Sequence, residues 1–431
     1  MILVNIVNFK ILIMYKITVL FVLLVTLVYG ANATGLKVGA AWRDITPVST
    51  PVMVSGGAGA PSPANNIIGK LTTRVLVIAN GDTKLAIVSI DNIGVPMVVG
   101  DRIRALVPGI EPENILIGVT HTHSAPDAYG LADENGNSGT NLKYIDMMVE
   151  KTAEAINEAS GNLKSAYLKV AVGEAEGKIA YNYYAPRLYD PRCGVMQFIT
   201  AKDGKTIATL VNYAIHPEVI GSDRDICSPD LVGPLYDKIE KEAGGMAIFM
   251  NSAQGGMVTA DNRREGGKEA NDWNECIRIG ELLGSEALRI ISDAGVQKSP
   301  EISILHTSVN LPVETDLMNF ILKNAIFEYK LNKKGEIVTR MDLLNIGSAR
   351  AITIPGEALP NIGYYLKRKM NSDNPFLFGL TNDAFGYIIS KEDFNGFERY
   401  NYICRTTLGE KTAEIIEDAA LKLVEKADAA K

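Results

Sequence analysis

The chain contains four histidines, at positions 121, 123, 216 and 306, so any metal or acid–base chemistry that uses imidazole draws on these four. His121 and His123 stand in the segment Thr120–Pro126 (THTHSAP), directly after the apolar run Asn114–Val119, which we expect to be a strand. In extended chain, residues i and i+2 point to the same side, so both rings could aim at one point beyond the strand. Such a pair can present two ligands to zinc. The alternative is a polar loop in which both rings make ordinary hydrogen bonds.

His216 also ends an apolar stretch, and Pro217 stops the strand immediately afterwards. A lone histidine in such a place is more often a capping or packing residue. Two strand-end histidine sites among four histidines nevertheless favour one shared site. His306 lies in the middle of an expected strand with no partner motif, and we expect it to be structural.

Two further residues carry ligand chemistry. Glu357 follows an expected strand and opens an expected helix, where an acidic residue is also favoured simply by the helix N-terminus. Tyr387 lies beside Gly386 and, on its own, is typical of a packing residue.

The loop Asn251–Asn262 follows a buried strand and is rich in hydroxyls, amides and glycines. Such a loop could carry a nucleophile or oxyanion donors, although it lacks the G-x-S-x-G pattern of an α/β-hydrolase.

The elements that must position these residues alternate between strands and helices, and no low-complexity linker divides them. This pattern predicts an α/β protein with mixed β-sheets flanked by helices, in one large catalytic domain over residues 34–431. We expect strands at 71–80, 84–91, 114–119, 165–172, 195–200, 206–213, 247–251 and 302–313, and two more within 336–354. We expect helices at 141–159, 229–242, 272–294, 358–370 and 411–429.

The N-terminal segment is expected to lie outside this fold. A lysine at position 16 precedes an apolar run that ends in Ala31-Asn32-Ala33, which is the pattern of a cleaved signal peptide over residues 1–33. An uncleaved anchor is the alternative, but the apolar run is short for a full span. We therefore expect a secreted or periplasmic protein. The four cysteines could pair there or be buried small residues.

The charge balance limits the partners. The 431 residues carry 43 Lys+Arg and 50 Asp+Glu, a formal net charge of −7. A nucleic-acid-binding protein would normally show a basic footprint, so we expect no nucleic-acid partner. The acidic balance also gives no electrostatic attraction to anionic membranes, which leaves only transient membrane-surface contact.

Several segments, taken in order, resemble the neutral/alkaline non-lysosomal ceramidase family. They are Val38–Pro47, Thr73–Val77, Ser89–Asp91, Thr120–Pro126 with its T-H-T-H-S-x-P pattern, Asn212–Pro217, Pro355–Glu357 and Gly379–Ile388. The resemblance implies a zinc-dependent amidase that cleaves the N-acyl bond of ceramide, a lipid amide, to sphingosine and fatty acid.

The resemblance also implies roles for individual residues. His121, His216, Glu357 and Tyr387 match the zinc ligands, and His123 matches a histidine on the substrate side of the metal. Tyr400 resembles the family's second active-site tyrosine, and Thr259 falls near its catalytic-loop serine. Asp44 and Asp91, in matched segments, could orient the histidines or cap turns.

The sequence departs from the family pattern in three places. Thr259 adds a methyl group to the expected hydroxyl. Asn182-Tyr183 stands near the family's substrate-contacting arginine, and Arg187 is the nearest arginine. Typical members continue into a C-terminal β-sandwich domain, which we do not expect within these 431 residues. These departures keep two alternatives open: a zinc hydrolase acting on another amide or ester, such as a glycan or peptide, and a secreted binding protein that holds zinc without turnover.

Overall fold

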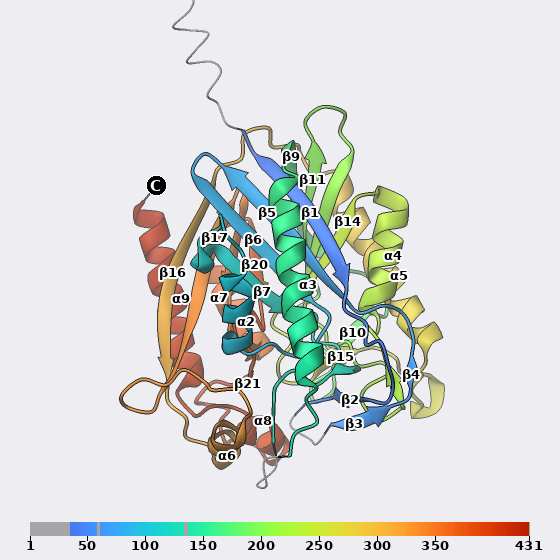
Figure 1. The fold of residues 1–431 in the computed structure, drawn as a ribbon, viewed down its shortest axis with the longest axis vertical. Helices are drawn as coiled ribbons and strands as arrows, with labels where there is room; N and C mark the ends of the chain where they lie inside the picture. The colour runs from blue at the N-terminus through green and yellow to red at the C-terminus, as the bar shows by residue number, and fades with distance from the viewer. Residues whose placement is uncertain (1–34, 58–60, 133–136, 431) are drawn as a thin grey trace, which may run out of the picture. The chain divides into compact units, whose positions relative to one another are not determined.

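A mixed β-sheet forms the centre of the computed structural model, which describes residues 35–57, 61–132 and 137–430 (Figure 1). Within these residues the sheet has eight strands in the order β14-β12-β11-β9-β1-β5-β6-β7. Their bounds are β1 Lys37–Asp44, β5 Thr72–Asn80, β6 Thr83–Ile90, β7 Ile115–Val119, β9 Lys164–Glu174, β11 Arg192–Thr200, β12 Thr206–Tyr213 and β14 Met246–Asn251.

A second sheet packs against the inner face of the first. Its strands run in the order β16-β17-β18-β20, with bounds β16 Ile302–Leu311, β17 Ile337–Ile346, β18 Ala349–Thr353 and β20 Asn374–Phe378. Leu76 and Ile78 of β5 and Phe198 of β11 share one buried cluster with Phe376 and Phe378 of β20. The large apolar side chains between the sheets exclude water from both inner faces.

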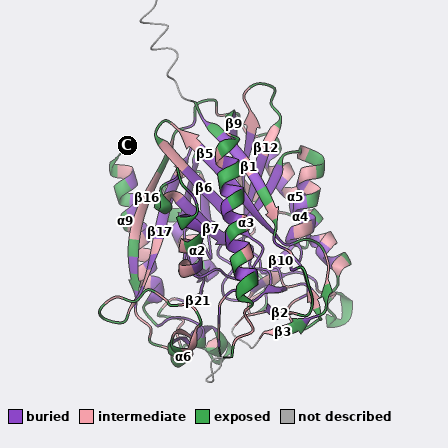
Figure 2. Cartoon of the chain, in the orientation of Figure 1, coloured by how far each residue is buried: buried purple, intermediate pink, exposed green. Residues whose placement is uncertain are grey.

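Helices cover the two outer faces, which gives the described region an α/β/β/α order of layers. The alternate residues of β5, such as Val75 and Val77, pack against α3 (Leu142–Gly161), which crosses β1 and β5 in Figure 1. The other end of that face is covered by α4 (Val232–Ala243) and α5 (Trp273–Ser292). The second sheet is covered by α7 (Pro360–Lys369) and α9 (Thr412–Ala429). Strands sandwiched in this way read as near-continuous apolar runs, and Figure 2 shows them buried while the helices expose one face.

The carboxyl ends of several strands point toward the same end of the first sheet. β6 runs parallel to β7, and β12 runs parallel to β14. Short elements gather beyond these ends in Figure 1. They are β2 Val52–Ser55, β3 Ser62–Ala64, β8 Ala125–Pro126, β10 Ala180–Asn182, β15 Val258–Ala260, β19 Gly356–Ala358, β21 Phe385–Ile388, α6 Asp316–Asn324 and α8 Asn401–Arg405. Parallel neighbours therefore place the loops that carry the predicted chemistry side by side.

The predicted fold class is confirmed, and most predicted elements are found within a few residues of their expected bounds. Glu357 differs, because it lies within the short strand β19 and the following helix begins only at Pro360. The sequence did not predict four of the observed elements, which are β1, α2 (Met97–Ala105), α6 and β20. The two helices have only nine residues each and β20 only five, so their periodicity was too brief to read.

Residues 36–431 form one compact unit by their internal contacts. The predicted signal peptide over 1–33 lies outside the described residues. None of the helices in the described part is long and apolar enough to cross a membrane. All four cysteines are buried and free, as expected of small core residues.

Candidate metal centre

Three of the four histidines converge at the ends of β7 and β12. The rings of His121 and His123 lie 4.8 Å apart between centroids, and those of His121 and His216 are equally close. One donor atom from each ring lies within 4.8 Å of the others. The sequence therefore predicted correctly that the two strand ends share a site. His306, by contrast, bonds to Asp342 and Asn114 elsewhere in the fold.

The convergence of the H-x-H pair does not come from an extended backbone, as we had expected. His121 has a φ of 69°, in the left-handed region that a non-glycine residue adopts only under constraint. Its amide donates to the carbonyl of Asn92, and its Nδ1 lies 2.6 Å from the carbonyl oxygen of Ile93. These two contacts with the chain after β6 hold the strained turn in place.

Backbone carbonyls also fix which nitrogen of each ring faces the centre. His216 Nδ1 lies 2.8 Å from the carbonyl oxygen of Val258, in the same way that His121 Nδ1 faces Ile93. A carbonyl can only accept, so Nδ1 carries the proton in both rings. The lone pair of Nε2 is then left for the centre, which is the arrangement of metal-binding histidines.

Glu357 completes the cluster from β19, which pairs with β21 in a separate two-stranded sheet. Its Oε2 lies 3.1 Å from His216 Nε2 and 3.5 Å from His121 Nε2, while His123 Nε2 lies 3.3 Å from His121 Nε2. Four ligand atoms placed tetrahedrally at about 2.1 Å from one ion are about 3.4 Å from one another. The contacts of Glu357 with His121 and His216 are of this size, so these three residues could hold a metal ion such as zinc, with His123 beside them.

The electrostatics of the cluster reflect the same proximity. Burial opposes ionisation of Glu357, but His121 and His216 outweigh it and lower the pKa of the carboxyl well below its usual range. Burial also disfavours charge on His216, yet Glu357 and Glu218 raise its pKa to about 9. Burial together with the two neighbouring imidazoles lowers the pKa of His123. Glu357 is therefore ionised and shares the proton of His216, and a bound cation would take the place of that proton.

An apolar cavity of about 710 Å³, counting the part open to solvent, leads to this cluster. His121, His123, Glu357 and Tyr387 line its inner end. The remaining walls are mostly apolar or aromatic, and they include Leu131, Met318, Ile321, Leu322, Tyr129, Tyr329, Phe385 and Tyr402. The shape and lining suit an alkyl chain whose end lies against the polar cluster.

Tyr387 stands beside Glu357, its register partner in the pairing of β19 with β21. Its hydroxyl lies 3.6 Å from Met257 Sδ. Burial and the charge of Glu357 raise the pKa of the phenol, which keeps it neutral. The structure therefore places Tyr387 in the cavity wall with the predicted ligands.

Thr259 and Tyr400 are not in the lining of this cavity. Thr259 lies in β15, forms a bridge with His216, and faces a separate polar pocket. Tyr400 stacks on Tyr184 with ring centroids 5.8 Å apart. Tyr402, which sequence reasoning missed, lines the cavity instead and lies edge-on to Tyr387. On a helical turn, residues two apart point in different directions, so Tyr400 and Tyr402 cannot both face the cavity. Considering Tyr402 as an alternative to Tyr400 could therefore have identified it from the sequence.

The residues near the family's substrate-contacting arginine line two different pockets. Tyr183 faces the same polar pocket as Thr259, whereas Arg187 lines a different pocket beside Asp190. Glu218, which we had not singled out, lies 3.4 Å from His123 Nδ1. It follows His216 by two residues, and no motif marks it.

The two aspartates of the matched segments cap backbone groups. Asp44 accepts from the amide of Thr46, and Asp91 accepts from the amide and hydroxyl of Thr72. Among the described residues, the partners of the histidine Nδ1 atoms are carbonyls and Glu218 rather than these aspartates. Of the two expectations for Asp44 and Asp91, the capping role is the one observed.

The fold and the site together define an α/β protein with a histidine cluster that could hold a metal ion, at the end of an apolar cavity. Residues 36–268, more than half of the chain, match the family described as neutral/alkaline non-lysosomal ceramidase, N-terminal, and the chain belongs to that family. Family and fold support a ceramidase-like hydrolase. No curated protein matches the chain.

Two solved structures are similar to this one. The neutral ceramidase of Pseudomonas aeruginosa has a TM-score of 0.75 at 17% identity, over 91% of this chain and 75% of that one. A structure titled "Ceramidase complexed with C2" has a TM-score of 0.75 at 16% identity, over 92% of this chain and 76% of that one. At this level of identity the likeness shows the shared fold.

Proposed function

We propose that this protein is a secreted zinc-dependent amidohydrolase that cleaves the N-acyl bond of ceramide-like lipid amides to fatty acid and amine. The observation that carries the proposal is the meeting of a carbonyl-anchored histidine cluster with an apolar cavity. Membership of the ceramidase family supports the reaction class, and a solved relative whose title names a C2 complex supports a lipid amide as substrate.

His121, His216 and Glu357 would hold the zinc ion, and Tyr387 stands beside them as a further ligand. When bound, zinc would supply Lewis acidity toward the amide carbonyl. The apolar cavity would hold the acyl chain and keep bulk water away from the reacting carbonyl.

His123 is suited to moving the proton. Glu218 Oε2 lies 3.4 Å from its Nδ1 and would favour a proton there, which leaves the Nε2 lone pair toward the cluster. His123 would take a proton from the attacking water and pass it to the departing amine as the C–N bond breaks. A tyrosine hydroxyl, from Tyr400 as the family pattern predicts or from Tyr402 as the cavity lining favours, would donate to the developing oxyanion. Thr259 would assist as a hydroxyl donor from the adjacent pocket.

The test is hydrolysis of a fluorescent short-chain ceramide by the purified protein, zinc-loaded and chelated. Zinc-dependent release of the fatty acid is expected, and His121→Ala should lose both zinc and turnover. An active His121→Ala protein that keeps its zinc would refute the assignment of the site. Stoichiometric zinc without turnover of ceramide would move the substrate to another amide or ester, or favour a binding protein.

A further inference from the structure

A second, polar pocket lies on the other side of the metal centre. Its volume is about 620 Å³, counting the part open to solvent, and its walls come from the loops after β12 and β14 and from β10. Nine residues line it, most of them with hydrogen-bonding side chains: Tyr181, Tyr183, Glu218, Arg224, Met257, Thr259, Asn262, Glu269 and Asn271.

The polar pocket and the apolar cavity share no lining residue, but two contacts join their walls. His123 of the cavity contacts Glu218 of the pocket at 3.4 Å between Nδ1 and Oε2. Tyr387 of the cavity contacts Met257 of the pocket at 3.6 Å between the hydroxyl and Sδ. The metal centre therefore lies between an apolar space and a polar one, and one imidazole ring reaches from the first to the second.

Met257 is the movable part of this partition. It has a φ of 72°, a left-handed conformation that L side chains rarely adopt. Residues in such conformations cluster where a backbone is held for function. The side chain is unbranched and flexible, so it can shift without disturbing the fold. Met257 lies between the two spaces through its contact with Tyr387, so a connection between them would require this side chain to shift.

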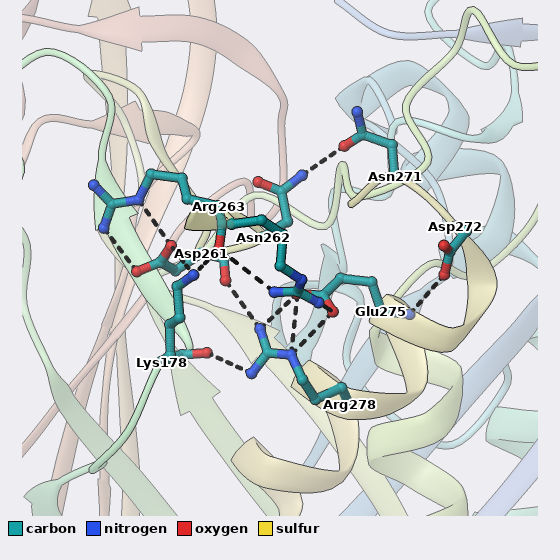
Figure 3. A network of polar contacts seen from close by, with 9 residues as sticks. Lys178, Asp261, Asn262, Arg263, Asn271, Asp272, Glu275 and Arg278 are labelled. Atoms are coloured by element: carbon teal, nitrogen blue, oxygen red, sulfur yellow. Dashed lines mark hydrogen bonds and ion pairs between the residues drawn. The ribbon is translucent and has the colours of Figure 1, made fainter. Parts of the chain in front are cut away.

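Two residues of the polar pocket, Asn262 and Asn271, belong to a network of polar contacts (Figure 3). The side-chain amides of Asn262 and Asn271 lie 2.6 Å apart, and the Asn271 oxygen accepts from Arg224 at 2.9 Å. The neighbouring Asp261 is held by Arg263 through two hydrogen bonds of 2.7 and 2.8 Å, and its carbonyl accepts from Arg278 at 2.9 Å. Burial opposes ionisation of Asp261, but Arg263 outweighs it and lowers the pKa of the carboxyl. Fixed amides on a charged framework are pre-organised to receive a ligand.

We propose that this polar pocket binds the amine portion of the substrate and that this portion is rich in hydroxyls, as in an N-acyl amino sugar. The inference rests on the function proposed above and narrows its substrate class. Amides, phenols and carboxylates together both donate to and accept from neighbouring hydroxyls. The two carboxylates, Glu218 and Glu269, outnumber the single guanidinium of Arg224, which disfavours an acidic amine portion.

A binding experiment tests the pocket without turnover. N-hexanoylglucosamine is titrated by calorimetry into the chelator-treated full-length protein. Tyr183→Ala and Arg224→Ala should each weaken binding at least about fivefold, the loss expected when one or two hydrogen bonds disappear. Arg187→Ala is the matched control, because Arg187 lines a different pocket, and it should leave binding within about twofold of the wild type.

A turnover experiment tests the connection. The zinc-loaded protein is offered three dodecanoyl amides with the same acyl chain, of glucosamine, hexylamine and glutamate. The kcat/KM for the glucosamide should exceed that for the hexylamide by at least about tenfold, and that for the glutamide by a larger factor. Arg224→Ala should reduce the ratio of glucosamide to hexylamide kcat/KM at least about fivefold. Met257→Ala, which opens the partition, should raise kcat/KM for the glucosamide, whereas Met257→Leu should not.

The outcomes separate the two proposals. Equal turnover of glucosamide and hexylamide with no binding of N-hexanoylglucosamine would overturn the polar subsite and leave the amidohydrolase intact. Tyr183- and Arg224-dependent binding without hydrolysis of any amide would support the subsite and overturn the proposed reaction. Faster turnover of the glutamide than of the glucosamide would also overturn the inference, since it would assign the pocket to acidic groups.

Discussion

Asp91, at the end of β6, should make the protein less stable as the pH rises from 4 to 7.5. The side chain is 1% exposed, and burial raises the pKa of its carboxyl from 3.8 to about 6, although hydrogen bonds from Thr72 and the charge of Arg74 act in the opposite direction. The folded state therefore keeps a proton that the unfolded chain has already lost. Between pH 3.8 and 6 the folded state binds more protons, so the free energy of unfolding falls with rising pH.

The size of the effect follows from the shift. About two pKa units correspond to about 3 kcal/mol, of which about 2 kcal/mol falls between pH 4 and pH 7.5. Asp91→Asn should remove this loss with little rearrangement. Oδ2 accepts from Thr72 at 2.7 Å, and Asn can keep this contact. Oδ1 has no hydrogen-bond partner among the described residues, and neither has the nearby Thr120 hydroxyl, which an amide could reach.

The assay is urea unfolding of both proteins at pH 4 and 7.5. Relative to the wild type, Asp91→Asn should be about 2 kcal/mol more stable at the higher pH than at the lower one. Asp82→Asn, at an exposed turn, controls for the loss of one charge. A difference between Asp91→Asn and wild type that is the same at both pH values would refute the reasoning. Zinc content should not change, because Asp91 bonds to Thr72 rather than to a histidine.

Three further predictions concern the site. Zinc at 1,000 times its Kd should stabilise the wild type by about 4 kcal/mol, seen as a higher Tm that a chelator reverses, and His121→Ala should show no such rise. Thr259→Ala should lower kcat about a hundredfold while Thr259→Ser stays within about threefold, because the hydroxyl and not the methyl is used; equal losses in both variants would contradict this. Leu322→Trp should narrow the apolar cavity and lower kcat/KM for dodecanoyl amides about tenfold more than for acetyl amides, and a uniform loss would place the acyl chain elsewhere.

The sequence predicted the layers of the fold because burial on both faces of a strand leaves a visible apolar run. The segments 71–80 and 84–91 differ from β5 and β6 by only a residue at either end. The same argument failed for α6, a helix of nine residues with one buried side chain, Met318, and two apolar residues turned toward the cavity. A helix of nine residues is shorter than the window over which apolar spacing separates helix from strand, so α6 could not be read from the sequence.

The convergence of the histidines and Glu357 was predictable for a related reason. A histidine or glutamate at the end of an apolar strand is easily recognised in the sequence. His121 and His216 follow such strands, and Glu357 lies in a short strand. Glu218 and Tyr402 were not predictable, since neither belongs to a recognisable motif. Their place depends on how the loop after β12 and the helix α8 fold back toward His123 and Tyr387, and no local pattern encodes that path.

Strand ends and loops contribute differently to the choice of substrate. Backbone carbonyls at strand ends anchor His121 and His216, so the fold fixes these two rings whatever lies around them. The partition between the apolar cavity and the polar pocket consists of side chains on loops, chiefly Met257 and Glu218, which can change without disturbing the sheets. Specificity reflects the difference in binding between competing substrates, and here that difference arises at residues that the strands do not constrain. Substitutions at Met257 should therefore redirect the choice of amine while zinc binding is unchanged, because backbone carbonyls and not Met257 hold His121 and His216.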